Sequence, residues 1–202
     1  MTTTVRKPRG EYGKSRARRQ EIVNAAVEVF ATVGYHKGSL RDVADRVGMS
    51  QAGLLHHFPS KEHLLQAVLT WRDDDARALM GEPQPTGTDL LRFLVFLAGH
   101  NSGRPQLVEL HVILSGEGAS IEHPLHAYFV ERYERVYVMI RDAFEEAAER
   151  GDLREGVDTS SAAKAVIALL DGLQLQWLLH REQVDMAADL RRYLQLLLTV
   201  DI

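Results

Sequence analysis

The side chains best suited to reading the edges of DNA bases lie close together in one stretch of the chain. Arg41 can form a pair of hydrogen bonds with guanine, and Gln51 can do the same with adenine. Leu55 can lie against the methyl group of thymine, while the small residues Ala52 and Gly53 would let the backbone approach another surface closely. These residue types predict contact with the major groove of double-stranded DNA.

Ser60 and Lys61 add the chemistry of a phosphate contact. A cation in the first turn of a helix opposes the helix dipole unless an anion lies there to be shared. The free backbone N–H groups of that turn, the Ser60 hydroxyl and the Lys61 ammonium can together surround one phosphate group. We expect this helix start to hold the DNA backbone.

Two short helices joined by a tight turn must position these side chains. Ser39 can cap the first helix, which Gly48 ends, and Ser50 can cap a second helix of about eight residues. Within the second helix only Leu54 and Phe58 point inward, one turn apart, which is too few apolar residues for a core element. The pattern is that of a helix–turn–helix, whose second helix enters the major groove.

The rest of the chain has helical periodicity and no strand-like alternation of useful length. Apolar residues from Ile22 to Val33 recur at helical spacing, and Gly34 is expected to end that helix. A fourth helix begins at Ser60, and its apolar stripe continues toward Arg72. After a linker rich in Gly and Pro come amphipathic segments near 88–101, 104–117, 124–150, 159–180 and 186–200. We therefore predict an all-α fold of about nine helices.

Composition and charge restrict the partners of the chain. Its 202 residues include no cysteine, which excludes disulfides, thiolate zinc sites and a cysteine nucleophile. Residues 1–63 hold eleven basic and six acidic residues, a net charge of +5, whereas the remainder has thirteen basic and twenty-two acidic residues, a net −9. One end is thus expected to meet a polyanion, with the basic segment Arg6–Arg19 as a DNA-binding arm or a solubilising tail. No apolar run approaches the ~20 residues of a membrane span, so the prediction is a cytoplasmic protein without a membrane partner.

Two strings in this region resemble the TetR family of transcriptional regulators. SLRDVADRVGMS at 39–50 is similar to the family's second helix and turn, and LLHHFPSKE at 54–62 is similar to its recognition helix running into the fourth helix. The resemblance covers residues 16–66 and implies a repressor that forms a homodimer through its last two helices and holds a small-molecule effector in its C-terminal part. By position, the DNA-contacting places of the family fall on Ser39, Arg41, Gln51, His56, His57 and Lys61.

The expected domains follow from this comparison. We expect a basic flexible arm over residues 1–15, a three-helix DNA-binding domain over 16–62, and a helical effector-binding and dimerisation domain over 63–202. Leu55 departs from the family pattern, which usually has tyrosine at that place. The leucine keeps the apolar contact and loses a hydrogen bond, so the operator sequence is not expected to carry over from relatives.

Aromatic and polar residues of the C-terminal part are expected to project from several helices toward a common interior. A packed core explains most of them, but buried Tyr, Trp and Gln side chains need polar partners, and a cavity with a few such groups is typical of a small-molecule site. The candidate ligand-binding residues are Trp71, Phe93, Phe96, His100, Leu110, His111, Leu114, Tyr133, Tyr137, Gln174 and Trp177.

The last two helices carry apolar stripes that predict a dimer interface. The final helix is apolar over more than one face, which requires partners on two sides. A four-helix contact across a two-fold axis would supply them. The residues expected in this interface are Val166, Leu169, Leu170, Leu173, Leu190, Tyr193, Leu194 and Leu197.

Neither catalytic residues, nor a metal site, nor a cofactor is predicted. His56 and His57 point about 100° apart on a helix and cannot easily share one ion. No Gly-x-Ser-x-Gly turn or phosphate-binding glycine motif is present, so an enzyme is not expected. The alternative is a helical small-molecule-binding protein or enzyme whose helix–turn–helix no longer reads DNA, which Leu55 and the overall acidity favour.

Overall fold

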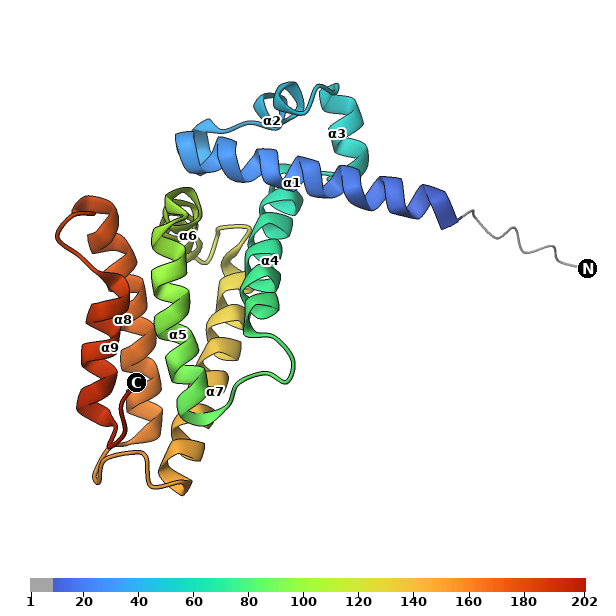
Figure 1. Ribbon diagram of the computed structural model, residues 1–202. Helices are drawn as coiled ribbons and strands as arrows, with labels where there is room; N and C mark the ends of the chain where they lie inside the picture. The colour runs from blue at the N-terminus through green and yellow to red at the C-terminus, as the bar shows by residue number, and fades with distance from the viewer. Residues whose placement is uncertain (1–8) are drawn as a thin grey trace, which may run out of the picture. The chain divides into compact units, whose positions relative to one another are not determined.

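The computed structural model describes residues 9–202, and within that range it consists of helices joined by loops, as Figure 1 shows, with no strand beyond one isolated bridge between Leu153 and Leu198. The all-α prediction is confirmed. The helices of the described range are α1 (Arg9–Lys37), α2 (Leu40–Arg46), α3 (Gln51–His57), α4 (Lys61–Met80), α5 (Gly87–Ser102), α6 (Pro105–Gly118), α7 (His126–Glu149), α8 (Thr159–Leu179) and α9 (Met186–Leu197).

The first helix is longer at both ends than its apolar stripe. It begins at Arg9, within the segment expected to be a flexible arm, while residues 1–8 of that arm lie outside the described residues. It continues to Lys37, so the prediction that Gly34 ends it is wrong. Glycine in a helix interior costs only about 1 kcal/mol relative to alanine, which neighbouring turns can offset.

The chain divides into two compact units, Met1–Trp71 and Arg72–Ile202, and α4 contributes residues to both. In the first unit, buried residues of four helices form the core, among them Ile22, Phe30, Val43, Leu54 and Leu65, all without exposed surface. The turns between the short helices are fixed by caps at their starts. These features hold the helix–turn–helix as one packed body.

Two arginines of the expected arm are used to bind α1 to the helix–turn–helix. Arg18 donates to the carbonyl of Val47 at 3.0 Å. The guanidinium of Arg19 lies 4.1 Å from the ring centroid of Phe58 and donates to the carbonyl of His57. The prediction of DNA contact is therefore weakened for these two residues, because their side chains already stabilise the position of the second short helix.

The second unit is a helical bundle in which α5 packs against α7 and α9, and α8 packs against α6, α7 and α9. By length and composition alone α8 could cross a membrane, although no single run in the sequence suggested it. In the structure its Ala163, Val166 and Trp177 are buried in the bundle core, as expected for a core helix. The chain's last residues also pack on this unit: Thr199 N–H donates to the Asp152 carbonyl at 2.8 Å, and Ile202 is buried.

Candidate functional site

The helix α3 is held by one end and one face, which leaves its other side chains uncommitted to packing. The Ser50 hydroxyl accepts the N–H of Gly53 at 3.1 Å and so caps the helix. Leu54 has no exposed surface and Phe58, which follows the helix, is 1% exposed. The predicted base-reading residues Gln51, Ala52, Leu55 and His56 all lie at the surface of this helix.

Gly53 has a structural function inside the unit. A Cβ atom there would lie 3.3 Å from both the Met49 Cε and the Ser50 Oγ. Any larger residue would therefore press on the capping hydroxyl. The absence of a side chain serves the cap as well as any approach of the helix to DNA.

Ser39 and Arg41 lie at the start of α2, where the Ser39 side chain is hydrogen-bonded within the protein and the Arg41 side chain is largely exposed. Ser39 and Asp42 form a reciprocal cap, in which the serine hydroxyl donates to Asp42 Oδ2 at 2.6 Å and accepts the Asp42 N–H at 3.2 Å. The hydroxyl and backbone N–H of Ser39 lower the pKa of the Asp42 carboxyl. The side chain of Arg41 is 80% exposed, with its Nε 3.9 Å from the Asp45 carboxylate. It is thus available to a partner in solution.

The side chains of Ser60 and Lys61, at the start of α4, both have contacts within the first unit. The Ser60 hydroxyl is 2.8 Å from His63 Nδ1, and the Lys61 ammonium lies 5.3 Å from the centre of the Phe30 ring. His57 and Lys61 are half-buried. Contact of Lys61 with a DNA phosphate stays a prediction, and its ammonium group would make that contact from a position near the Phe30 ring.

A cavity of about 240 Å³ lies within the second unit, lined by residues of α4 to α9. It is lined by His111, Tyr133 and Gln174 from the predicted ligand-binding residues. The other predicted residues are not part of this lining, namely Trp71, Phe93, Phe96, His100, Leu110, Leu114, Tyr137 and Trp177. Leu110 and Leu114 are instead buried in the core.

Phe96 is the clearest departure from the expected common interior, since it is 53% exposed. The buried stripe of α5 includes Leu91, Leu94 and Ala98, at spacings of three and four residues. At about 100° per residue, Phe96 points to the opposite side of the helix from Leu94. The prediction that it projects inward is wrong for this reason.

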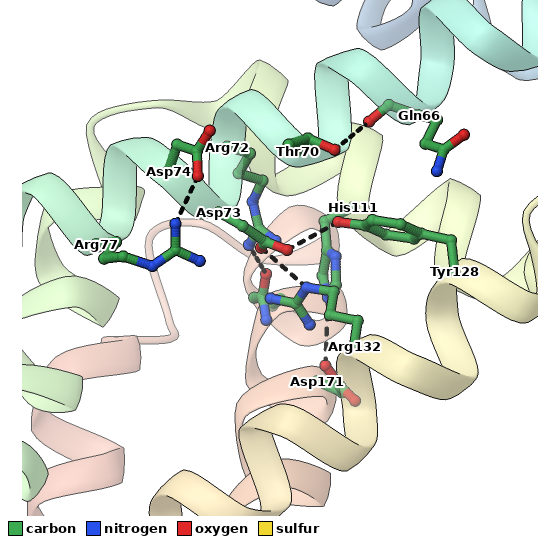
Figure 2. A network of polar contacts seen from close by, with 11 residues as sticks. Gln66, Thr70, Arg72, Asp73, Asp74, Arg77, His111, Tyr128, Arg132 and Asp171 are labelled. Carbon is green, nitrogen blue, oxygen red and sulfur yellow. Dashed lines mark hydrogen bonds and ion pairs between the residues drawn. The ribbon is translucent and has the colours of Figure 1, made fainter.

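A polar network crosses the cavity wall and joins residues far apart in the sequence (Figure 2). Asp73 accepts hydrogen bonds from the Tyr128 hydroxyl at 2.8 Å and from Arg132 Nε at 3.0 Å. Burial alone would raise the pKa of Asp73, but the Arg132 charge and these two hydrogen bonds outweigh it and lower the pKa. Asp73 is therefore an ionised carboxylate, and each of its oxygens accepts one hydrogen bond.

Asp171 forms the second half of the network. It accepts a hydrogen bond from the Tyr133 hydroxyl at 2.7 Å, and its other oxygen is 3.5 Å from His111 Nε2. Burial raises the pKa of Asp171, yet the bonds from His111 and Tyr133 outweigh it and lower that pKa. Burial and the bond to Asp171 raise the pKa of Tyr133, so the phenol keeps its proton.

His111 and Arg72 are the least satisfied groups of the cavity. His111 is 2% exposed, and its Nδ1 has no hydrogen-bond partner among the described residues. Burial and the nearby Arg72 lower the pKa of His111 to about 3, so the ring is neutral, with Nε2–H directed to Asp171 and Nδ1 an acceptor. Burial and Arg132 lower the pKa of Arg72 to about 10, which leaves the guanidinium charged at neutral pH.

The sequence interpretation missed all six charged residues of this cavity lining, namely Arg72, Asp73, Arg77, Arg132, Arg135 and Asp171. Two of them carried a signal. Arg72 falls on the continued apolar stripe of α4, and Asp171 is the one acidic residue in the apolar helix α8. A charge on an apolar face indicates a group at least partly shielded from water, which needs a polar partner.

The residues predicted to form a dimer interface lie mainly inside the chain's own core. Val166, Leu190 and Leu194 have no exposed surface, which leaves none for a second copy, and Leu170 and Leu173 line the cavity. Leu169, Tyr193 and Leu197 are half-buried against the same core. The apolar stripes face inward because α8 and α9 pack against each other and against neighbouring helices. The large apolar residues that these two helices expose are Leu175, Leu179 and Leu196.

Comparison with known proteins adds two family matches. Residues 22–68 match the model described as "Bacterial regulatory proteins, tetR family", and residues 104–199 match "BetI-type transcriptional repressor, C-terminal". The chain is 24% identical over 200 residues to the HTH-type transcriptional regulator TtgR of Pseudomonas putida, covering 94% of this chain and 92% of TtgR.

Solved structures share the fold over most of its length. A putative transcriptional regulator from Saccharomonospora viridis in complex with choline aligns with a TM-score of 0.76 at 22% identity, covering 92% of this chain and 100% of that one. A complex of triclosan with SmeT, the repressor of a multidrug efflux pump of Stenotrophomonas maltophilia, aligns with a TM-score of 0.74 at 22% identity, covering 89% of each chain. At these identities the likeness is one of fold.

Proposed function

Because this chain belongs to the TetR family of transcriptional regulators, we propose that it is a cytoplasmic repressor that binds a near-palindromic operator as a homodimer and is released by a small-molecule effector. The observation that carries the proposal is the surface of α3. Its packing is satisfied by Leu54 and Phe58, while Gln51 and Leu55 remain at the surface. The exposed side chains of such a helix are available to contact bases in the major groove of DNA.

The proposed DNA-contacting residues of one subunit, called its reading head, are exposed or half-buried. Arg41, with its 80% exposed side chain, and Gln51 supply two-point hydrogen bonds to guanine and adenine. Leu55 supplies apolar contact with thymine, and His56, His57 and Lys61 supply contacts to phosphates or bases. Two such heads, one from each subunit, reach successive major grooves about 34–36 Å apart, which requires a near-palindromic site.

The proposed dimer uses the surface of α8 and α9 that the protomer leaves apolar. Leu175, Leu179 and Leu196 are 48%, 66% and 71% exposed. Burial of these side chains against a second copy would remove apolar surface that water otherwise contacts. We therefore assign the interface to these residues and not to the buried stripe of the same helices.

The proposed effector site is the cavity of the second unit. Two solved structures of this fold are complexes with choline and with triclosan, which supports binding of a small molecule by this chain. The helix α4 begins with Lys61 and lines the cavity from Arg72 to Met80. A ligand that prefers the non-binding state by about 3 kcal/mol would shift occupancy of the operator more than 100-fold.

The test is DNA binding by matched glutamine variants of the full-length chain. We expect Gln51→Ala to weaken binding to the selected operator by about 1–3 kcal/mol, because a bidentate base contact is lost. Gln106→Ala, an exposed glutamine of α6, is the control and should bind as the wild type does. Unchanged binding by both Gln51→Ala and Arg41→Ala would contradict the assignment of the reading residues.

A further inference from the structure

The cavity of the second unit separates polar lining from apolar lining along its helices. On α4, Arg72 and Met80 both line it, and they lie about 12 Å apart because an α-helix rises about 1.5 Å per residue. On α7, Arg132 and Met139 both line it at a separation of about 10 Å. Each helix thus brings an arginine to one level of the cavity and a methionine to another, with a second arginine, Arg77 or Arg135, between the two levels.

The helix α8 repeats this separation in the opposite chain direction. Its Asp171 lies level with Tyr133, as their 2.7 Å hydrogen bond shows. Further along the pair of helices, the Tyr137 hydroxyl is 2.8 Å from the Ser160 hydroxyl, so α7 and α8 run antiparallel. Ile167 of α8 therefore lies toward the apolar level, and Asp171 lies at the polar one.

The polar end contains a guanidinium with few partners. Arg72 makes one hydrogen bond within the described residues, from Nη2 to Gln174 Oε1 at 3.5 Å, although a guanidinium carries five N–H donors. The two nearby carboxylates do not compensate it by direct contact. Asp73 is held by Tyr128 and Arg132, and Asp171 by Tyr133 and His111.

The same end contains a buried acceptor without a donor. His111 is 2% exposed and its Nδ1 has no partner among the described residues. A buried polar atom left without a hydrogen bond is costly, so such atoms usually mark the place of a ligand or an ordered water. The cavity wall thus combines guanidinium donors that an anion can use with one acceptor that an ordered water can use, because an ionised carboxylate has no hydrogen to donate.

We propose that this cavity binds a small amphiphilic carboxylate, with its anionic group on Arg72 and its hydrocarbon tail toward Met80 and Ile167. The inference rests on the effector site of the proposed function and names its ligand class. A carboxylate accepts two parallel N–H bonds from a guanidinium, the pairing that Arg72 lacks within the protein. The cavity of about 240 Å³ has room for a small organic molecule.

The lining argues against a quaternary ammonium such as the choline held by one structural relative. Cations of that kind are recognised by several aromatic faces. Among the described residues, Tyr133 is the one aromatic residue in the lining, and both carboxylates have donors already. The two guanidiniums and the two carboxylates of the polar end balance in charge, so the preference for an anion rests on the N–H donors that Arg72 does not use within the described residues.

Calorimetric titration of the full-length chain with three probes of equal tail length tests the proposal. The probes are octanoate, 1-octanol and octyltrimethylammonium, added to wild type, Arg72→Met and Arg77→Met. Arg77 also lines the cavity but is exposed and paired with Asp74 at 2.6 Å, so it is the matched control. We expect octanoate to bind wild type and Arg77→Met alike, and to bind Arg72→Met at least tenfold more weakly. Arg72→Lys, which keeps the charge but not the fork, should be intermediate.

Three results would overturn the proposal. One is stronger binding of octyltrimethylammonium than of octanoate, and another is the absence of octanoate binding by a folded chain. The third is equal affinity for octanol and octanoate, with neither affinity changed by Arg72→Met. A melting curve of each variant establishes folding. Operator binding is measured separately by fluorescence anisotropy. Octanoate binding that depends on Arg72 without release of DNA would support the carboxylate site and contradict the proposed effector role. Specific operator binding without octanoate binding would support the proposed DNA recognition and contradict the carboxylate site.

Discussion

Substitution by alanine should affect different properties at two neighbouring leucines of α3: the stability of the fold at Leu54 and the affinity for DNA at Leu55. Leu54 has no exposed surface, whereas Leu55 is 37% exposed. Leu54→Ala removes three carbons from a packed site and leaves a cavity, so we expect the free energy of unfolding of the first unit to fall by about 2–5 kcal/mol. Leu55→Ala should change it by no more than about 0.5 kcal/mol, since the side chain borders water.

Urea unfolding resolves this difference. In a Trp177→Phe background the fluorescence of Trp71, the last residue of the first unit, reports on that unit, and far-UV circular dichroism follows the whole chain. The midpoint for Leu54→Ala should move to lower urea with an unchanged slope, and the midpoint for Leu55→Ala should stay in place.

DNA binding gives the complementary result. In buffer without urea, where both variants are folded, Leu55→Ala should weaken operator binding by about 1 kcal/mol, because apolar contact with the bases is lost. Equal destabilisation by the two substitutions would refute the reasoning, since it would mean that the inward and outward faces of α3 are not those described.

Three further outcomes are expected. Gly118→Ala should destabilise the second unit by about 1–3 kcal/mol in thermal unfolding, because its Cβ would lie 2.5 Å from the Phe129 ring, whereas Gly116→Ala, with no atom within 4 Å, should be neutral or stabilising. Between pH 6.5 and about 3 the unfolded chain binds a proton at His111 that the folded chain does not, so stability should fall with decreasing pH by at most about 1.4 kcal/mol per unit; His111→Gln should flatten that decline in urea titrations, and an unchanged slope would contradict it. Deletion of 198–202 removes the buried side chains of Leu198 and Ile202 and should lower the unfolding free energy by about 3–6 kcal/mol; a chain that melts as the wild type does would show that this tail is not packed as described.

The positions of the short helices could be predicted from local chemistry. Ser39 and Ser50 are capping residues at the places where α2 and α3 begin, and the structure shows both caps. The inward positions Leu54 and Phe58 followed from helical spacing and are confirmed as buried. Such features depend on residues within one or two turns, which the sequence displays directly.

The composition of the cavity could not be predicted in the same way. Helical spacing identifies which face of a helix is apolar, but it does not tell whether that face packs against the chain's own helices or against a second copy of the chain. Val166 and Leu190 therefore looked equally suited to a dimer interface and to the chain's own core, where the structure places them. Arg132 and Asp73 become a partly buried pair only through the contact of α7 with α4, between residues 59 positions apart in the sequence.

The most direct test of the account is the binding of the full-length protein to DNA flanking its own gene, titrated at several salt concentrations with nonspecific competitor present. The account predicts nanomolar binding to one near-palindromic stretch, with an affinity that falls steeply as salt rises. Weak binding that is equal for all sequences and displaced by competitor would contradict the claim that α3 reads DNA.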